Sequence, residues 1–375
     1  MKVLHLLSDW KWTGASDPVV SLCEHLTLAG LEIQLAFRKA PENFPEKTVG
    51  KEVVKRGING YDEFRLSRYF SFKDWVFDLR SISRYAIKEG FHIIHTHLNH
   101  DHSIAAASLF AASRGPLLVR TDHKRDGLDR GFAMKRLLGR TDGLMAYSRK
   151  ILAKDVENFG YPGERTCVLP PGITIYTGTT QDLRSDLGVG PGEKIVGVIG
   201  RLKPDRGYDL IIKAFKLLRD RIDGVKLVIV GRSSQIEESI VKPVAALGLQ
   251  GDVVLAGYRF DDYFSMISTF DLFVMMRAGS DGTARALREV LAAGKPAIVS
   301  DRGMLPELVD DGRTGYVVSD EKQLARRMEE VLTQDTLRAT LGDAARRTAV
   351  ERWDFGVQAK RCIDFYERLL SLGRR

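Results

Sequence analysis

Two carboxylates in the C-terminal half, Asp281 and Glu289, are separated by seven residues, and Gly282-Thr283-Ala284 follows the first of them. If a helix begins directly after Asp281, Glu289 lies about two turns along it, and both carboxylates reach one pocket. Backbone N–H groups at such a helix start lack partners within the helix and suit phosphate or sugar oxygens. Carboxylates accept hydroxyl hydrogen bonds, which sugar and ribose diols offer. The alternative is an N-cap at Asp281 and a solvated Glu289.

Histidines are concentrated in one segment of the N-terminal half, and five of the eight lie within residues 92–102. Such density is typical of metal sites. Strand alternation places His95 and His97 on one face. No cysteine accompanies them, so the sequence predicts no metal and favours a contact of His97 with an acceptor molecule.

Apolar runs alternate with helix-length segments along the whole chain. The strands and helices that this alternation predicts would position the carboxylates and histidines described above. Strands are predicted at 3–7, 33–37, 92–95, 117–119, 144–146 and 167–169, then at 194–199, 227–230, 253–256, 272–275, 297–299 and 316–318. Helices are predicted at 19–29, 75–89, 103–112, 209–219, 237–247, 285–293 and 321–332. The alternation predicts an α/β fold of two tandem Rossmann-like, doubly wound parallel-sheet domains. Ligands of such folds bind at the carboxyl ends of the strands, here in a central cleft.

A boundary is predicted where Pro170-Pro171-Gly172 is followed by the polar stretch 174–192. The N-terminal domain is expected to span residues 1–172 and the C-terminal domain residues 173–355. A last helix, within residues 356–375, is expected to pack back on the first domain.

The composition is that of a soluble globular protein, with 375 residues of which 44% are hydrophobic and 28% charged. The three cysteines are far apart, which favours a reducing cytoplasm. The first apolar run meets charge at Asp9, too soon for a signal peptide, and no run approaches a membrane span. The net charge of +8 favours an anionic partner.

The segment from Asp281 resembles a known family. The spacing from Asp281 to Glu289, the sequence Ala293-Gly294-Lys295-Pro296 and the later Gly312-Arg313-Thr314-Gly315 are similar to the retaining family-4 (group 1) glycosyltransferases of the GT-B fold. The family has a glutamate where this chain has Asp281, and Thr283 and Ala284 depart from its glycine-rich turn. The resemblance implies that Asp281 and residues 282–284 bind the donor sugar and phosphates, and that Glu289 binds the nucleotide ribose.

Other turns carry the same resemblance. Arg201 and Arg206, within Gly200–Gly207, resemble the family's diphosphate clamp, in which two cations hold both phosphates. Gly231 and the pair Tyr258 and Arg259 occupy strand ends, and the pair resembles the edge that receives the nucleobase. Surface cations and ordinary turns are the alternatives.

The resemblance assigns roles in the N-terminal half as well. Gly14 matches a glycine loop whose backbone N–H groups face the diphosphate. His123 resembles the family histidine beside the acceptor and the transferred sugar, where an imidazole hydrogen-bonds a hydroxyl or a phosphate. A structural histidine and an ordinary turn glycine are the alternatives.

The expected function is therefore transfer of a sugar, hexosyl or heptosyl, from a nucleotide sugar to an acceptor hydroxyl, with retention and without a metal or other cofactor. The partners are the donor and a glycan or glycolipid acceptor, in a setting such as lipopolysaccharide synthesis. The expected location is the cytoplasm, with peripheral attachment to an anionic membrane through a basic and aromatic patch in the first domain. That patch comprises Phe64, Arg65, Arg68, Tyr69, Phe70, Phe72, Lys73, Trp75 and Phe77, followed by Lys124, Arg125, Arg130, Lys135, Arg136 and Arg140.

Other classes of protein are disfavoured. No G-x-G-x-x-G motif follows an early strand, and no P-loop is present. No nucleic-acid module is recognisable, so a nucleic-acid partner is not expected. A non-catalytic protein of the same fold that binds a sugar or a nucleotide sugar is the remaining alternative.

Overall fold

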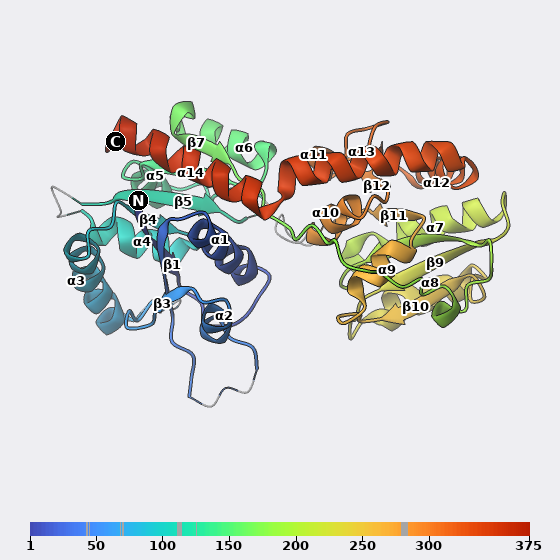
Figure 1. Ribbon diagram of the computed structural model, residues 1–375, viewed down its shortest axis with the longest axis horizontal. Coiled ribbons are helices and arrows are strands. Elements are labelled where there is room, and N and C mark those ends of the chain that lie inside the picture. Colours follow the sequence, from blue (N-terminus) through green and yellow to red (C-terminus); the bar gives the residue numbers. More distant parts are fainter. Residues whose placement is uncertain are drawn as a thin grey trace. The chain divides into compact units, whose positions relative to one another are not determined.

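The computed structural model describes residues 1–42, 44, 46–67, 69, 71–110, 115–124, 126–278 and 284–375. The chain divides into two compact units. Unit 1 comprises Met1–Gly172 with Phe355–Arg375, and unit 2 comprises Ile173–Asp354. Each unit is an α/β body built on one parallel sheet (Figure 1).

Unit 1 contains a seven-stranded sheet in the order β3-β2-β1-β4-β5-β6-β7. Its strands are β1 (Lys2–Leu7), β2 (Glu32–Phe37), β3 (Asn59–Tyr61), β4 (Ile93–Thr96), β5 (Leu117–Asp122), β6 (Gly143–Ala146) and β7 (Thr166–Val168). Its helices are α1 (Ser16–Leu28), α2 (Val49–Lys55), α3 (Phe72–Lys88), α4 (Asn99–Ser108), α5 (Phe132–Leu138), α6 (Arg149–Phe159), the 3₁₀ turn η1 (Gly163–Arg165) and α14 (Phe355–Leu372).

Helices cover both faces of this sheet because successive side chains of each strand point to opposite sides. Val3 and Leu7 of β1 pack with residues of α1 and α14 on one face. Leu4 and Leu6 pack with residues of α3 and α4 on the other face. Burial on both faces explains why the strands read as nearly continuous apolar runs. Helices α3 and α4 lie side by side (Figure 1).

Unit 2 contains a six-stranded sheet in the order β10-β9-β8-β11-β12-β13. Its strands are β8 (Lys194–Ile199), β9 (Val225–Val230), β10 (Val253–Gly257), β11 (Leu272–Met275), β12 (Ala297–Ser300) and β13 (Gly315–Val318). Its helices are α7 (Tyr208–Arg219), α8 (Lys242–Ala246), α9 (Tyr263–Thr269), α10 (Arg285–Ala292), α11 (Leu305–Leu308), α12 (Glu321–Thr333) and α13 (Asp335–Trp353), with 3₁₀ turns η2 (Ser185–Leu187) and η3 (Pro204–Arg206) and the π-helical turn η4 (Glu237–Val241).

Both sheets have the strand order of doubly wound folds, in which the chain starts near the middle and winds outwards in two directions. The predicted α/β class with two parallel sheets is therefore confirmed. The predicted helix at 237–247 is instead a π turn followed by α8. Pro243 near the start of α8 has no N–H to donate to the preceding turn, which interrupts the regular α pattern.

The chain leaves unit 2 through α13 and re-enters unit 1 through α14, with an extended Asp354 between the helices. Helix α14 packs against α1, and Phe355 at its start stacks on His25 at a centroid distance of 4.1 Å. Among the described helices, none has both the length and the hydropathy needed to cross a membrane.

Candidate functional site

A pocket of about 790 Å³ lies at the carboxyl ends of β8, β9 and β10 in unit 2. Parallel strands deliver their following turns to the same edge of a sheet, and this is where doubly wound folds bind ligands. Twelve residues line the pocket: Ile199, Gly200, Arg201, Lys203, Val230, Gly231, Arg232, Ser233, Ser234, Tyr258, Arg259 and Tyr263. Four of the predicted site residues, Arg201, Gly231, Tyr258 and Arg259, are therefore together.

Backbone hydrogen bonds tie the three turns of this edge to one another. The Gly200 N–H donates to the Val230 carbonyl at 3.0 Å, and the Gly231 N–H donates to the Gly257 carbonyl at 2.8 Å. Gly231 has a φ of +151°, and a Cβ at this position would lie 1.9 Å from the Gly200 carbonyl oxygen. A side chain is therefore excluded here by close backbone approach.

The pocket is positively charged. Within the part of the chain that the structure describes, Arg201, Lys203 and Arg232 form no ion pair with a carboxylate. The Arg232 guanidinium instead lies over the Tyr258 ring, 4.7 Å from its centroid. Arg259 is neutralised, because its Nη1 donates to Asp262 Oδ2 at 2.8 Å. Three unpaired cations around one cavity favour an anion with several charges.

The predicted partner of Arg201 points elsewhere. Arg206 Nη1 donates to the Ala278 carbonyl at 2.9 Å, and its Nε lies 3.5 Å from Asp205. Arg206 is not among the described residues that line the pocket. Arg206 is the last residue of the short 3₁₀ turn η3, and its side chain reaches the Ala278 carbonyl instead of the pocket. Lys203, which the sequence interpretation did not select, lines the pocket together with Arg201.

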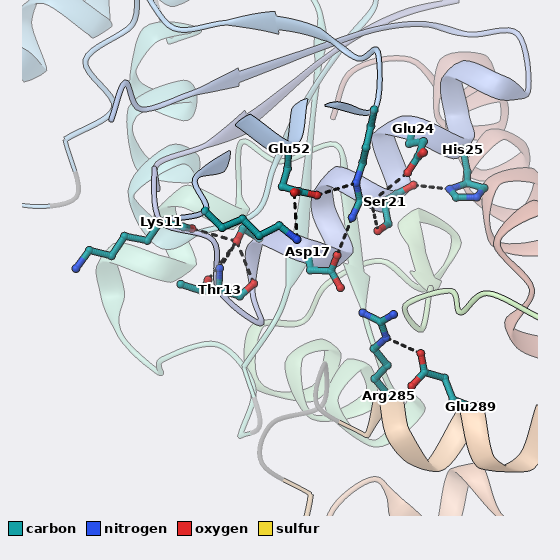
Figure 2. Close-up of polar contacts among 12 residues, drawn as sticks. Lys11, Thr13, Asp17, Ser21, Glu24, His25, Glu52, Arg285 and Glu289 are labelled. Atoms are coloured by element: carbon teal, nitrogen blue, oxygen red, sulfur yellow. Dashed lines mark hydrogen bonds and ion pairs between the residues drawn. The ribbon is translucent and has the colours of Figure 1, made fainter. Parts of the chain in front are cut away.

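Glu289 is buried and held by two donors. The Tyr263 hydroxyl donates to Oε2 at 2.7 Å, and Arg285 Nε donates to Oε1 at 2.7 Å, the contact drawn in Figure 2. Burial, and next the charge of Glu289, raise the pKa of Tyr263 well above its usual value, so its hydroxyl keeps its proton. Tyr263 also lines the cationic pocket, and Glu289 lines a second cavity of about 220 Å³.

Helix α10 begins at Arg285, as predicted for the helix at 285–293, and not directly after Asp281 as the two-turn spacing of the carboxylates assumed. Ala284 is its N-cap and Arg285 its first residue, so Glu289 lies one turn into the helix rather than two. This places Arg285 and Glu289 on one face at the i, i+4 spacing. Ala284 is fully buried in the core of unit 2. Asp281, Gly282 and Thr283 lie outside the described residues.

In unit 1, the two predicted histidines meet at the carboxyl ends of β4 and β5. His97 Nδ1 and His123 Nε2 are 3.1 Å apart. Burial, and next the charge of Arg120, lower the pKa of His123 to about 3, and burial lowers the pKa of His97 well below its usual value. Both imidazoles are therefore neutral near pH 7 and can exchange hydrogen bonds with hydroxyl groups.

Asp101 holds the turn that carries His97, a role that the sequence interpretation missed. Its Oδ2 accepts from the backbone N–H groups of His97 at 3.1 Å and Leu98 at 2.8 Å, and its Oδ1 accepts from the Ser8 N–H at 3.1 Å. The turns after β1 and β4 are thus fixed to each other. The predicted helix at 103–112 begins after Asp101, whereas α4 begins at Asn99 and has Asp101 in its first turn, where an aspartate can bind the N–H groups that precede the helix.

The histidine-dense segment does not converge on one point. The Lys2 N–H donates to His92 Nδ1 at 3.1 Å, and His102 Nε2 contacts Thr141 Oγ1 at 2.8 Å. A different trio, His5, His95 and His97, places one ring nitrogen each within 4.8 Å of the others. These rings are engaged in hydrogen bonds with one another and with Tyr366.

Gly14 lies in the exposed loop before α1. The loop is closed by the Thr13 N–H, which donates to Ser16 Oγ at 2.7 Å; Figure 2 shows Thr13 beside Lys11 in this turn. The N-cap of α1, Ala15, offers no side-chain acceptor to the first helical N–H groups. The N–H groups of Ser16 and Asp17 instead donate to the Thr13 carbonyl at 3.1 and 3.2 Å. The role of Gly14 at a diphosphate stays a prediction.

The basic and aromatic patch of unit 1 is partly exposed. Tyr69 and Phe72 present most of their side chains to solvent. Phe64 is instead buried in the core beneath α3 and α4, because it follows the edge strand β3 inwards. Phe132 at the start of α5 is also exposed and was not predicted. Arg68, Phe70 and Arg125 lie outside the described residues.

Two family models match the chain. The model of "Glycosyl transferases group 1" matches residues 179–348, and that of "Glycosyltransferase Family 4" matches residues 12–175. A D-inositol 3-phosphate glycosyltransferase of Nocardia farcinica is 27% identical over 252 residues, which are 65% of this chain and 54% of the relative. A lipopolysaccharide 1,2-N-acetylglucosaminetransferase of Salmonella typhimurium is 27% identical over 171 residues, 42% of this chain and 44% of the relative. The chain thus spans about half the length of these curated relatives.

Solved structures match over nearly the whole chain. A glycosyltransferase from Rickettsia africae ESF-5 has a TM-score of 0.82 with 16% identity, covering 99% of both chains. An Anabaena protein, HepE, solved in complex with UDP, has a TM-score of 0.77 with 19% identity, covering 98% of this chain and 100% of that chain. These likenesses show that the fold is that of the GT-B glycosyltransferases. The two family models, which together cover residues 12–175 and 179–348, place this chain in the group 1 glycosyltransferases, with an N-terminal part of glycosyltransferase family 4.

Proposed function

We propose that this protein transfers a sugar, hexosyl or heptosyl, from a nucleotide-sugar donor to an acceptor hydroxyl, with retention of configuration and without a metal ion. Three features support a nucleotide-sugar donor: the cationic pocket of unit 2, the family models and the UDP bound by the Anabaena neighbour. The observation that carries the proposal is the set of cations, Arg201, Lys203 and Arg232, that line one cavity and have no carboxylate partner among the described residues.

Departure of the nucleoside diphosphate is the step that these cations serve. As the glycosidic C–O bond lengthens, negative charge grows on the phosphate oxygens and the sugar carbon becomes oxocarbenium-like. Fixed cations stabilise this charge more in the transition state than in the ground state. The described residues that line the pocket include no carboxylate. The positive charge that faces the phosphates is therefore supplied by arginine and lysine side chains.

The donor's other parts have further candidates. Tyr258 offers a partly exposed ring for stacking of the base. Glu289, held by Tyr263 and Arg285, would accept hydrogen bonds from the ribose diol through its remaining lone pairs. Asp281 would orient hydroxyls of the transferred sugar.

In unit 1, His123 would bind the acceptor hydroxyl or a hydroxyl of the transferred sugar, with His97 behind it. We assign no residue as a covalent nucleophile. In the proposed route the acceptor hydroxyl attacks the sugar from the same face as the departing phosphate, which assists the attack. Gly14 would place backbone N–H groups near the diphosphate.

A cell-envelope glycan is the proposed acceptor, as in lipopolysaccharide synthesis, in line with the Salmonella relative. The exposed aromatic side chains of Tyr69, Phe72 and Phe132, with nearby lysines and arginines, would hold unit 1 at an anionic membrane surface. Binding of full-length protein to anionic but not neutral vesicles, lost at high salt, tests this part.

A non-catalytic protein that binds the same nucleotide sugar is the second candidate, and Asp281 in place of the family's glutamate is the feature that favours it. Turnover separates the two. UDP-, GDP-, ADP- and CMP-sugars are screened for binding, and the bound donor is then incubated with acceptors. Release of the nucleoside diphosphate with an α-linked product from an α-linked donor supports the enzyme. Tight binding without product supports the binding protein.

Arg201→Ala is the first variant to test. We expect kcat/KM to fall by about 10²-fold, because one cation at the leaving group is lost. Arg326→Ala is the matched control, since Arg326 is exposed on α12 and does not line the pocket. Equal activity of the two variants would contradict the assignment of the pocket.

A further inference from the structure

A continuous chain of hydrogen bonds runs through the interior of unit 1 and ends at His123. Its five links are 2.6, 2.6, 3.4, 3.0 and 3.1 Å long. They join, in order, Thr121 Oγ1 to His95 Nε2, His95 Nδ1 to Tyr366 Oη, Tyr366 Oη to His5 Nε2, His5 Nδ1 to His97 Nε2, and His97 Nδ1 to His123 Nε2. The chain joins three strand ends to the C-terminal helix α14, which contributes Tyr366.

The four histidines that form these links, His5, His95, His97 and His123, are neutral near pH 7. His5 and His95 are fully buried and His97 is almost so. Burial lowers the pKa of His5 to about 3 and the pKa of His95 and of His97 well below the usual value. A neutral imidazole has one N–H donor and one acceptor nitrogen. When both ring nitrogens are in links, the direction of one link therefore fixes the direction of the next.

Between Tyr366 and His123 the links can run in two directions, which differ in whether the Tyr366 oxygen accepts from His5 or its hydroxyl donates to His5. In the first, the Tyr366 hydroxyl donates to His95, and each later ring donates back towards Tyr366, so that His123 carries its proton on Nε2. In the second, Tyr366 donates to His5, every later link is reversed, and His123 carries its proton on Nδ1. The tautomer of His123 is thus coupled to whether Tyr366 accepts a hydrogen bond from His5 or donates one to it.

The distances favour the first arrangement. The Tyr366–His95 link is 2.6 Å and the Tyr366–His5 link 3.4 Å, so the hydroxyl proton belongs on the shorter one. His123 then keeps a lone pair on Nδ1. This atom is buried and has no hydrogen-bond partner among the described residues. A bare acceptor nitrogen at the end of β5 is suited to a hydroxyl donor from a bound molecule.

We propose that Tyr366, acting through His5 and His97, holds His123 in the Nε2–H tautomer, so that His123 presents Nδ1 as an acceptor to a substrate hydroxyl. The substrate part rests on the proposed function. Tyr366, His5 and His97 are positioning residues, and His123 is the residue that touches the substrate. The C-terminal helix α14, which is remote in sequence from β5, thereby determines which nitrogen of His123 accepts a hydrogen bond from the substrate.

The test compares Tyr366→Phe with Tyr161→Phe in full-length protein. Tyr161 is the matched control, because it is also buried in unit 1 and its hydroxyl donates to the Thr141 carbonyl at 2.6 Å, outside the chain. Long-range proton–nitrogen correlation spectra of isotope-labelled protein report which nitrogen of each histidine carries the proton. His123→Gln assigns the His123 signals. Thermal melting shows that the two phenylalanine variants fold alike.

We expect wild type and Tyr161→Phe to show the Nε2–H form of His123. Tyr366→Phe removes the acceptor for His5 Nε2, frees the later links to reverse and yields a substantial Nδ1–H fraction. His97→Gln, which cuts the chain next to His123, is expected to do the same. An Nδ1–H form in the wild type, or an unchanged tautomer in both variants, overturns the proposal.

Activity is a separate arm of the test. If His123 Nδ1 accepts a substrate hydrogen bond, Tyr366→Phe lowers kcat by about tenfold or more, while KM for the donor changes by less than about twofold. If Tyr366→Phe changes the tautomer of His123 but leaves kcat unchanged, the hydrogen-bond coupling is supported and the role of His123 in the proposed function is contradicted. The spectra need no substrate, so the two failures are distinguishable.

Discussion

The carboxylate of Glu289 illustrates how single residues prepare the site. It is buried, and a buried carboxylate is stable only when hydrogen bonds replace the water it has lost. Tyr263 and Arg285 supply them, one on each oxygen. Because each oxygen is already held by one donor, the carboxylate is fixed in orientation before any ligand binds. Such preorganisation lowers the cost of ordering a binding group.

Tyr263→Phe tests this arrangement. The variant leaves Glu289 Oε2 without its 2.7 Å donor, and a hydrogen bond to a charged group contributes about 1.5–3 kcal/mol. We expect binding of UDP to weaken by about tenfold in calorimetric titration. Tyr61→Phe is the control, because the Tyr61 hydroxyl also donates to a glutamate, Glu63, but at an exposed position in unit 1. Equal affinities of the two variants would argue against a ligand role for Glu289.

Asp155 is a second buried carboxyl with a measurable consequence. Burial, and next the charge of Asp122, raise its pKa to about 7 from the usual value of 3.8. Between these pH values the folded protein holds a proton that the unfolded chain has released. The free energy of unfolding therefore contains a contribution from Asp155 that is present below about pH 4 and is lost as pH rises to about 7.

Asp155→Asn removes this contribution while keeping an oxygen that accepts from the Leu128 N–H at 2.8 Å. The variant should therefore gain stability relative to wild type as pH rises from about 4 to about 7, measured by urea denaturation. The buried histidines cancel in this comparison because both proteins contain them. Parallel curves across that range would show that Asp155 is ionised throughout.

At the scale of elements, the cationic pocket depends on how closely three turns approach. The turn after β9 touches the turn after β8, and only a residue without a side chain fits between them. This approach brings Arg201 and Arg232, which are distant in sequence, to one cavity. The pocket therefore depends on the order of the strands in the sheet, which brings these turns together, as much as on the residues that the turns carry.

Gly231→Ala should disrupt this edge. The added Cβ would meet the Gly200 carbonyl oxygen at 1.9 Å, so one turn must move. We expect loss of UDP binding by at least about tenfold and a lowered melting temperature, since strain at a fixed backbone position costs about 1–3 kcal/mol. Gly251→Ala, in the turn before β10, is the control, because nothing lies within 4 Å of a Cβ there. Normal UDP binding by Gly231→Ala would show that the two turns adjust independently of the pocket.

Much of this element pattern is predictable from sequence, and the exceptions have physical reasons. The twelve predicted strands form because parallel strands buried on both faces are apolar throughout. The strand β3 has only three residues, at a sheet edge, and carries no such signal. Helix α13 was missed because apolar and polar side chains are mixed around it rather than separated on two faces. The direction of Arg206 depends on a 3₁₀ turn, which spacing alone does not encode.

At the scale of the whole molecule, the chain crosses between two bodies that each have their own core. Helix α14 is the last element in sequence but belongs to unit 1. Its Phe365 and Leu369 pack with strands formed at the very start of the chain. Unit 1 is therefore incomplete until α14 is made, whereas unit 2 is formed from one continuous segment.

Leu369→Ala tests whether stability follows this division. Leu369 is fully buried and packed so closely on β6 that a Cβ on Gly143 would lie 2.4 Å from its Cδ1. A cavity at such a site costs about 2–5 kcal/mol. We expect hydrogen exchange to accelerate in β1, β6 and α14 of unit 1, while amides of β8 and β9 in unit 2 keep their protection. The neighbouring Leu370→Ala, at a position 38% exposed, should change neither. Equal acceleration in both units would instead mean that they unfold as one cooperative body, and that the return of α14 couples their stabilities.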